Sequence, residues 1–178
     1  GLNGGGRGYY ALDITDPVAP TLLWEFTPAQ DADLGYTFGQ PVITRKADGT
    51  WVVLVTSGYN NTSTGTGVGY LYVLNANSGS MLGKISTGVG NTTTPSGLSR
   101  IAVWNDEPDG NKAGYVYGGD LLGNVWRFDV NTDSVMKFAT LLDPSGVGQP
   151  ITTSPVLGQV SSKRVIIVVT GKYLETAD

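Results

Sequence analysis

Short runs of alternating apolar and polar residues, or of clustered β-branched residues, fill the chain from one end to the other. No segment shows the sustained 3.6-residue spacing of apolar positions that an amphipathic helix requires. The runs are separated by turns rich in Gly, Asn, Asp and Ser, a pattern typical of β-strands joined by tight connections. The expected strands cover residues 8–15, 21–27, 40–44, 50–57, 70–75, 81–86, 100–104, 115–120, 124–130, 135–142, 154–160 and 164–170.

Two sequence markers repeat in step along these strands. An aromatic residue, a spacer, an apolar residue and then Asp or Asn occur at Tyr10–Asp13, Tyr72–Asn75 and Trp126–Asp129, with the last residues about 62 and 54 positions apart. A glycine ends an apolar strand in Val55–Tyr59, Val116–Asp120 and Val169–Tyr173. A period of roughly 40–60 residues indicates repeated supersecondary units.

Each repeat accommodates a four-stranded antiparallel meander, and the chain holds roughly three of them. Such sheets arranged around an axis form a β-propeller, in which radial repetition leaves only short, protected strand edges. The unbroken apolar run Val165–Val169 predicts an inner strand that is buried on both faces. A β-sandwich is the alternative, but it does not explain why the two markers repeat in step.

Composition narrows the possible functions. The chain is 40% apolar, carries 15% charged residues and has a net charge of −4, with its basic residues scattered. Nucleic acid is therefore not expected as a partner, because phosphate binding needs clustered Lys and Arg. The absence of His and Cys removes the usual general base, thiol catalysis and thiolate metal sites.

The ends of the chain interrupt the repeat pattern, so we expect residues 1–178 to be a fragment of a single propeller domain within a larger protein. No apolar run approaches the 18 residues typical of a transmembrane helix. An open array of blades leaves strand edges unpaired, which predicts self-association through those edges.

Several long segments, in order and spanning nearly the whole chain, closely resemble the propeller domain of the PilC/PilY1 family of type IV pilus-associated proteins. The resemblance is strongest over the segment from Tyr117 to Asp129, which contains Gly-Gly-Asp-Leu-Leu-Gly-Asn. The other segments that carry it are Gly4–Pro17, Trp24–Phe26, Asp33–Pro41, Leu71–Leu74 and Thr170–Glu175.

The resemblance implies part of the C-terminal propeller of a large, exported bacterial protein at the cell surface or pilus. It implies a non-enzymatic role in pilus biogenesis, control of retraction, adhesion and twitching motility. The partners it implies are type IV pilus components and host-cell surface receptors.

The resemblance also implies one candidate metal site. Some family members carry a calcium loop of alternating Asp and Asn just before the segment that matches Tyr117–Asp120. Here the candidate ligands are Asn105, Glu107, Asp109 and Asn111, oxygen-bearing residues at alternating positions around a turn. Pro108 stiffens the middle of this loop, and Ala113 or Gly114 stands where a closing carboxylate is expected, so a metal-free hairpin turn is the alternative.

Other polar positions suit structural roles. Asp13, Asn75 and Asp129 end their strands at equivalent places and are expected to cap their own turns. Trp24 and Trp126 are expected to dock outer strands against the neighbouring unit, with Gly83 at about the corresponding place in the unit between. The polar loops at residues 60–69 and 88–97 are the connections expected to reach a partner.

The sequence is also compatible with two alternative functions. Quinoprotein dehydrogenases share the propeller and a repeat that the segment from Asn75 to Gly79 partly resembles, but they need a bound quinone and a calcium ion with a catalytic Asp. The chain could also be a structural spacer whose loops bind nothing.

Overall fold

The computed structural model describes residues 6–107 and 111–172, and this part of the chain contains strands and connections but no helix. Consequently, none of the described residues form a helix that could cross a membrane. Twelve strands lie close to the twelve ranges predicted from the pattern. They are β1 (Tyr9–Asp13), β2 (Thr21–Phe26), β3 (Val42–Arg45), β4 (Trp51–Thr56), β5 (Tyr70–Asn75), β6 (Met81–Ser86), β7 (Ile101–Glu107), β8 (Lys112–Gly119), β9 (Asn124–Asp129), β10 (Ser134–Thr140), β11 (Val156–Val160) and β12 (Lys163–Ile167).

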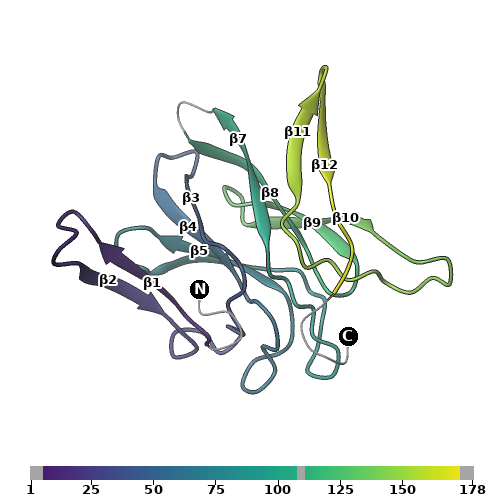
Figure 1. The fold of residues 1–178 in the computed structure, drawn as a ribbon, viewed down its shortest axis with the longest axis horizontal. Helices are drawn as coiled ribbons and strands as arrows, with labels where there is room; N and C mark the ends of the chain where they lie inside the picture. The colour runs from purple at the N-terminus through teal and green to yellow at the C-terminus, as the bar shows by residue number, and fades with distance from the viewer. Residues whose placement is uncertain (1–5, 108–110, 173–178) are drawn as a thin grey trace.

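The strands form antiparallel units that fan out in chain order, from β1 and β2 at one side to β11 and β12 at the other (Figure 1). Strands β3 to β6 make one four-stranded meander, and strands β7 to β10 make a second. A single parallel residue pair, Arg45 with Lys112, joins these two meanders into one eight-stranded sheet. The expected three units are therefore realised as two complete meanders flanked by the two-stranded pairs β1–β2 and β11–β12.

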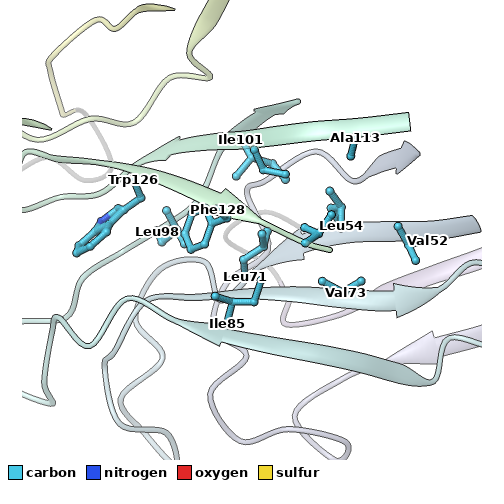
Figure 2. Packing of buried hydrophobic residues seen from close by; sticks show 12 residues of the cluster. Val52, Leu54, Leu71, Val73, Ile85, Leu98, Ile101, Ala113, Trp126 and Phe128 are labelled. Atoms are coloured by element: carbon cyan, nitrogen blue, oxygen red, sulfur yellow. The ribbon is translucent and has the colours of Figure 1, made fainter. Parts of the chain in front are cut away.

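The central strands β4 and β5 are buried on both faces because a neighbouring unit covers each side. Val52, Leu54, Leu71 and Val73 point toward the β7–β10 unit, where Figure 2 shows them beside Phe128 and other buried side chains. The alternate residues Val53, Val55, Tyr72 and Leu74 pack with Tyr9, Trp24, Phe26 and Leu34, from β1, β2 and the connection that follows β2. Successive strand residues point to opposite faces, so one meander contributes to two apolar layers.

Docking between units differs at equivalent positions of the outermost strands. Trp24 pairs with Ala11 in the β1–β2 ladder, as Gly83 pairs with Val73 and Met136 with Arg127 in theirs. The Trp24 indole donates a hydrogen bond to the Ala76 carbonyl of the next unit at 2.9 Å, which confirms the docking role expected for Trp24. Gly83 instead lies next to the carboxylate of Asp133 in the following unit.

The repeated Asx residues cap turns as predicted. Asp13 accepts a hydrogen bond from the Thr15 amide at 2.9 Å, and Asp129 accepts one from the Asn131 amide at 2.8 Å. Asn75 accepts two, from the amides of residues 77 and 78. These side chains stabilise their own turns and do not converge on a common site.

The prediction that the run Val165–Val169 is buried on both faces is wrong for the described structure. In β12, Ile167 is 58% exposed, and Val169 just beyond the strand is also 58% exposed. The β11–β12 pair is a separate two-stranded sheet, and no other described residues bury the side of it on which Ile167 and Val169 lie. Two-sided burial occurs in β4 and β5 instead.

Candidate functional site

The turns that follow the second strand of each unit meet the connections between units at one end of the molecule. In Figure 1 these segments lie along the lower edge of the view, opposite the tip of the β11–β12 hairpin. They enclose a half-open cavity of about 490 Å³, a size within the range of ligand pockets. The second sequence marker, the glycine-bearing strand end, thus marks the segments that form this cavity.

Backbone hydrogen bonds connect each turn to the connection that precedes its own unit. Tyr36 and Tyr59 exchange two such bonds, at 2.7 and 3.1 Å. The equivalent bonds run from Leu121 to Ser96 at 2.8 Å and from Gly171 to Pro150 at 2.7 Å. The first two turns are also bonded to the connection beyond their unit, through Gly58 N to Leu98 O and Ile151 N to Asp120 O, both at 2.9 Å.

Two glycines permit this close approach of the backbones. Gly58 adopts a φ of 68°, and a side chain at this position would collide with the Tyr36 carbonyl. Gly97 has a φ of 65° and lies against the Leu121 side chain. Both conformations belong to the left-handed region that glycine adopts without steric strain.

The lining of the cavity is mainly apolar and aromatic. Tyr36, Phe38 and Tyr59 form one side, with the rings of Phe38 and Tyr59 at 5.1 Å between centroids, and Leu121 and Leu122 form another. Asn60 and the stretch 93–95 contribute polar groups and a proline to the lining. Both loops predicted to reach a partner therefore contribute to this cavity.

Positive charges lie around the cavity. Lys172 is part of its lining, the Arg7 guanidinium lies 4.8 Å from the centre of the Tyr36 ring, and no Asp or Glu occurs among the described lining residues. Burial raises the pKa of the Tyr59 hydroxyl, while the positive charge of Arg100 acts in the opposite direction. Tyr59 is therefore neutral and serves as an apolar and hydrogen-bonding surface.

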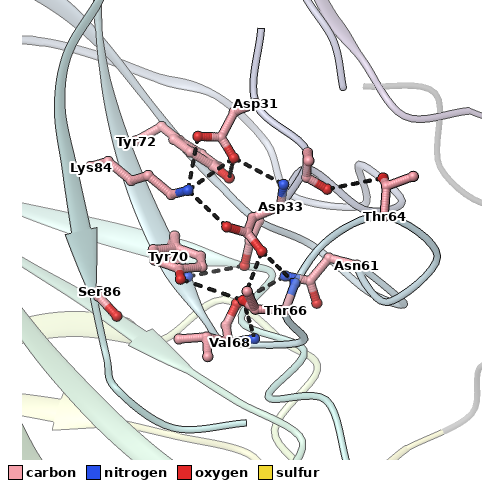
Figure 3. A network of polar contacts seen from close by, with 12 residues as sticks. Asp31, Asp33, Asn61, Thr64, Thr66, Val68, Tyr70, Tyr72, Lys84 and Ser86 are labelled. Atoms are coloured by element: carbon pink, nitrogen blue, oxygen red, sulfur yellow. Dashed lines mark hydrogen bonds and ion pairs between the residues drawn. The ribbon is translucent and has the colours of Figure 1, made fainter. Parts of the chain in front are cut away.

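The connection that carries Tyr36 and Phe38 is anchored by a charged network that sequence reasoning missed. In Figure 3 the Lys84 ammonium lies between the carboxylates of Asp31 and Asp33, each at 2.8 Å. It also lies 4.2 Å from the centre of the Tyr70 ring. Asp33 further accepts hydrogen bonds from the amide of Thr66 at 2.6 Å and from its hydroxyl at 2.7 Å, which attach the 60–69 loop.

The network keeps its charges at neutral pH. Burial alone would raise the pKa of Asp33, but hydrogen bonds from Lys84 and Thr66 outweigh it and hold that pKa below its ordinary value of 3.8. Burial acts to lower the pKa of Lys84, yet its bonds to Asp31 and Asp33 raise it above 10.5. A lysine held protonated in this way is a structural cation and is not available as a nucleophile.

Asp120 anchors the other side of the cavity, and none of the cations among the described residues is bonded to it. It is fully buried and accepts hydrogen bonds from the amides of Leu122 and Asn124, both at 2.9 Å, and from the Trp126 indole at 2.8 Å. The Asn124 side chain and the Ser96 hydroxyl donate two further contacts, at 3.0 and 3.3 Å. The prediction that Trp126 docks an outer strand is wrong, because Trp126 lies in the inner strand β9 and supports the turn of its own unit that carries Leu121 and Leu122.

The predicted calcium ligands are only partly described. Asn105 and Asn111 lie at the β7–β8 hairpin with their side chains hydrogen-bonded at 3.2 Å, while Asp109 and the side chain of Glu107 lie outside the described residues. The Asn111 carbonyl accepts bonds from Arg45 and Thr44, and Ala113 is buried where a closing ligand was expected. The described residues supply two neutral amides, which do not by themselves suit calcium, so the site stays a prediction.

The loop at residues 60–69, which was expected to reach a partner, is partly buried. Asn61 is 1% exposed and donates to the Val68 carbonyl at 2.9 Å, and Gly67 exchanges backbone bonds with Asn61 and Ser96. Because the loop packs onto neighbouring connections, three of its residues are buried, namely Asn61, Gly67 and Gly69. It is part of the wall of the cavity and not a free projection.

Comparison with known proteins gives consistent matches. A family model described as the PilY1 beta-propeller domain matches residues 1–140. The type IV pilus biogenesis factor PilY1 of Pseudomonas aeruginosa strain PAO1 is 34% identical over 99% of this chain, and a PilY1 homolog of Xylella fastidiosa is 35% identical over 99%. The crystal structure of the Pseudomonas aeruginosa PilY1 C-terminal domain superimposes with a TM-score of 0.83 over 97% of the chain, at 34% identity.

The chain spans 17% of the Pseudomonas protein, 14% of the Xylella protein and 40% of the crystallised domain. These matches, together with the meanders packed face to face, confirm the prediction of an all-β, partial β-propeller fold.

Proposed function

The chain belongs to the PilY1 β-propeller family, and from this premise we propose that it is a non-enzymatic binding part of an exported, surface-located type IV pilus-associated protein. The role we assign to the whole protein is pilus biogenesis, with control of retraction, adhesion and twitching motility. Pilus components are its proposed partners, and host-cell surface receptors are the proposed targets of adhesion.

The observation that supports a binding role is the cavity formed by turns and connections of successive units. Its lining residues come from segments that are fixed by backbone bonds and by the buried carboxylates Asp33 and Asp120. Loops held on a rigid scaffold are the usual location of binding function. Two ionisable groups near it, Asp33 and Asp120, hold these loops through hydrogen bonds.

The test uses the full-length protein in its bacterium. We expect Phe38→Ala, in the cavity, to reduce piliation, twitching or host-cell attachment at unchanged protein level. Trp51→Ala is the matched control, because Trp51 is 45% exposed at the start of β4, the end of that strand away from the cavity. Unchanged behaviour of Phe38→Ala in all three assays would favour a structural spacer.

Two further assays address the remaining predictions. Dye-linked alcohol or glucose oxidation after loading the full-length protein with pyrroloquinoline quinone would reveal an enzyme, and activity there would overturn the non-enzymatic proposal. Calorimetric titration with calcium, with EGTA as control, tests the 105–111 loop. No heat and no change in melting temperature would remove the calcium site.

Self-association is proposed for this chain when it is isolated. β1 pairs only with β2, and β12 only with β11, among the described residues. In the complete units the corresponding strands pair as β4 with β5 and β8 with β9, so the free edges of β12 and β1 are complementary. Light scattering at rising concentration checks this, and a strictly monomeric mass would contradict it.

A further inference from the structure

We propose that the cavity between the turns binds an acidic peptide segment that presents an apolar side chain. This inference rests on the binding role proposed above and adds the chemistry of the partner. It follows from the lining of the cavity, from the sign of the charges around it and from the way its walls are held.

The apolar side chain of the proposed peptide is inferred from the aromatic rings that line the cavity. Tyr36, Phe38 and Tyr59 come from two segments that are bonded to each other, so their positions are fixed before a ligand arrives. Aromatic walls favour aromatic, aliphatic or proline side chains. A cavity of about 490 Å³ with an open mouth suits one such side chain together with its flanking backbone.

The acidic character of the proposed peptide follows from the positive charges around the cavity. Lys172 in the lining, Arg7 against the Tyr36 ring and Arg100 near Tyr59 place three cations around the cavity of a chain whose net charge is −4. Asp120 lies below the lining, fully buried, with its oxygens occupied by donors from the protein. Such a field attracts anionic partners and disfavours cationic ones.

The polar rim suits a peptide backbone. Asn60, Thr93 and Thr94 line the cavity, are exposed, and carry both donors and acceptors. They complement the N–H and C=O groups of an extended peptide, whereas the rings accommodate its side chain. The rim therefore favours a peptide over a purely apolar ligand.

The test measures binding of capped, fluorescent pentapeptides to the purified full-length protein by anisotropy. One peptide has Phe between two Glu residues, the second has Phe between two Lys residues, and the third has Ser between two Glu residues. We expect the first to bind at least tenfold more tightly than either of the others at low salt.

Variants assign that preference to the cavity. Lys172→Glu, at an exposed position, should reduce the preference for Glu-flanked over Lys-flanked peptide at least threefold, while Lys137→Glu, exposed on β10, should leave it unchanged. Phe38→Ala should remove the preference for Phe over Ser. Its fold is checked by the thermal melting curve, and Leu122→Ser serves as a second cavity variant.

Equal affinity for the Glu-flanked and Lys-flanked peptides would overturn the inference, as would a preference that Lys172→Glu leaves intact. Binding of no peptide, as when another part of the polypeptide or a second copy covers the cavity, would also overturn it. If Phe38→Ala impairs pili while the peptides show no preference, the proposed function survives and this inference fails. If the peptides bind as expected but pili and attachment are normal, the proposed function fails.

Discussion

Asp33 and Asp120 perform the same task on opposite sides of the cavity with different chemistry. Each is a buried carboxylate that holds a connection or turn carrying lining residues. Asp33 accepts two bonds from Thr66 in the 60–69 loop, whereas Asp120 accepts two from backbone amides of its own turn. Asp33 is balanced by the Lys84 ammonium, which also bonds Asp31. Asp120 accepts only from backbone amides and neutral side chains.

The two carboxylates differ in how far along the sequence their bonding partners lie. The partners of Asp120 lie mostly within six residues of it, so the turn and its anchor form together. Asp33 and Lys84 are 51 residues apart: Asp33 lies in the connection between β2 and β3, and Lys84 lies in β6. The first anchor stabilises a turn, whereas the second fastens the connection between two units to the last strand of the second unit.

The largest expected effect comes from Asp120→Ala. The substitution leaves the Leu122 and Asn124 amides and the Trp126 indole buried without an acceptor, and each orphaned donor costs about 1–3 kcal/mol. We expect a loss of about 4 kcal/mol in the free energy of unfolding, measured by urea denaturation of the full-length domain. Asp120→Asn retains one acceptor oxygen and should lose about half as much. A loss below about 1 kcal/mol for Asp120→Ala would show that water replaces the carboxylate.

Lys84→Met ranks second. It leaves two carboxylates facing each other without a cation, but about a quarter of the Lys84 side chain is exposed, so water screens the repulsion. We expect a loss of about 1–2 kcal/mol by the same measurement. Adding Asp31→Asn and Asp33→Asn to Lys84→Met should recover about half of it, because the uncompensated charges are then gone. No recovery would mean that Lys84 acts through packing on Tyr70.

The strands could be predicted from the sequence because the alternation of apolar and polar residues and the residue types in turns are local signals. All twelve strands lie close to their expected ranges, and Asp13 and Asp129 cap the turns they were expected to cap. The bonds of Asp120 to its own turn could also have been predicted, because an Asp at a strand end, shortly before Gly and Asn, commonly accepts hydrogen bonds from the backbone amides that follow it. Its burial and its bond to Trp126 add a tertiary element to that local motif.

The charged network and the cavity could not be predicted in the same way. Nothing local distinguishes Lys84, in an outer strand, from other solvated lysines, and its partners are contributed by the distant connection between β2 and β3. The exposure of β12 depends on whether another unit packs against its face, and a run of five apolar residues carries no such information. The repeat indicated which turns are equivalent, but their position around a common cavity depends on the packing of whole units.

Acid pH should weaken the Asp33 anchor, with a smaller effect than the substitutions above. The pKa of Asp33 is lower in the folded protein than its ordinary value of 3.8, so its stabilising contribution is fully present above that value and is lost as the pH falls through the folded pKa. We expect the wild type to lose more stability between pH 5 and pH 2 than Asp33→Asn does, by melting temperature. Parallel curves for the two proteins would contradict the ionised network.

Salt gives the smallest effect and tests the same distinction directly. The Lys84 pairs are partly exposed, so raising sodium chloride from about 0.05 to 0.5 M should weaken them by a few tenths of a kcal/mol. The Asp120 cluster holds a fully buried charge within neutral donors and should respond little. The measurement is the stability difference between wild type and Lys84→Met at the two salt concentrations, compared with the difference between wild type and Asp120→Asn. The difference for Lys84→Met should shrink at high salt, while the difference for Asp120→Asn stays constant. If both differences shrink equally, salt screens the two carboxylates alike, and the ion pair is not what distinguishes the two sides of the cavity.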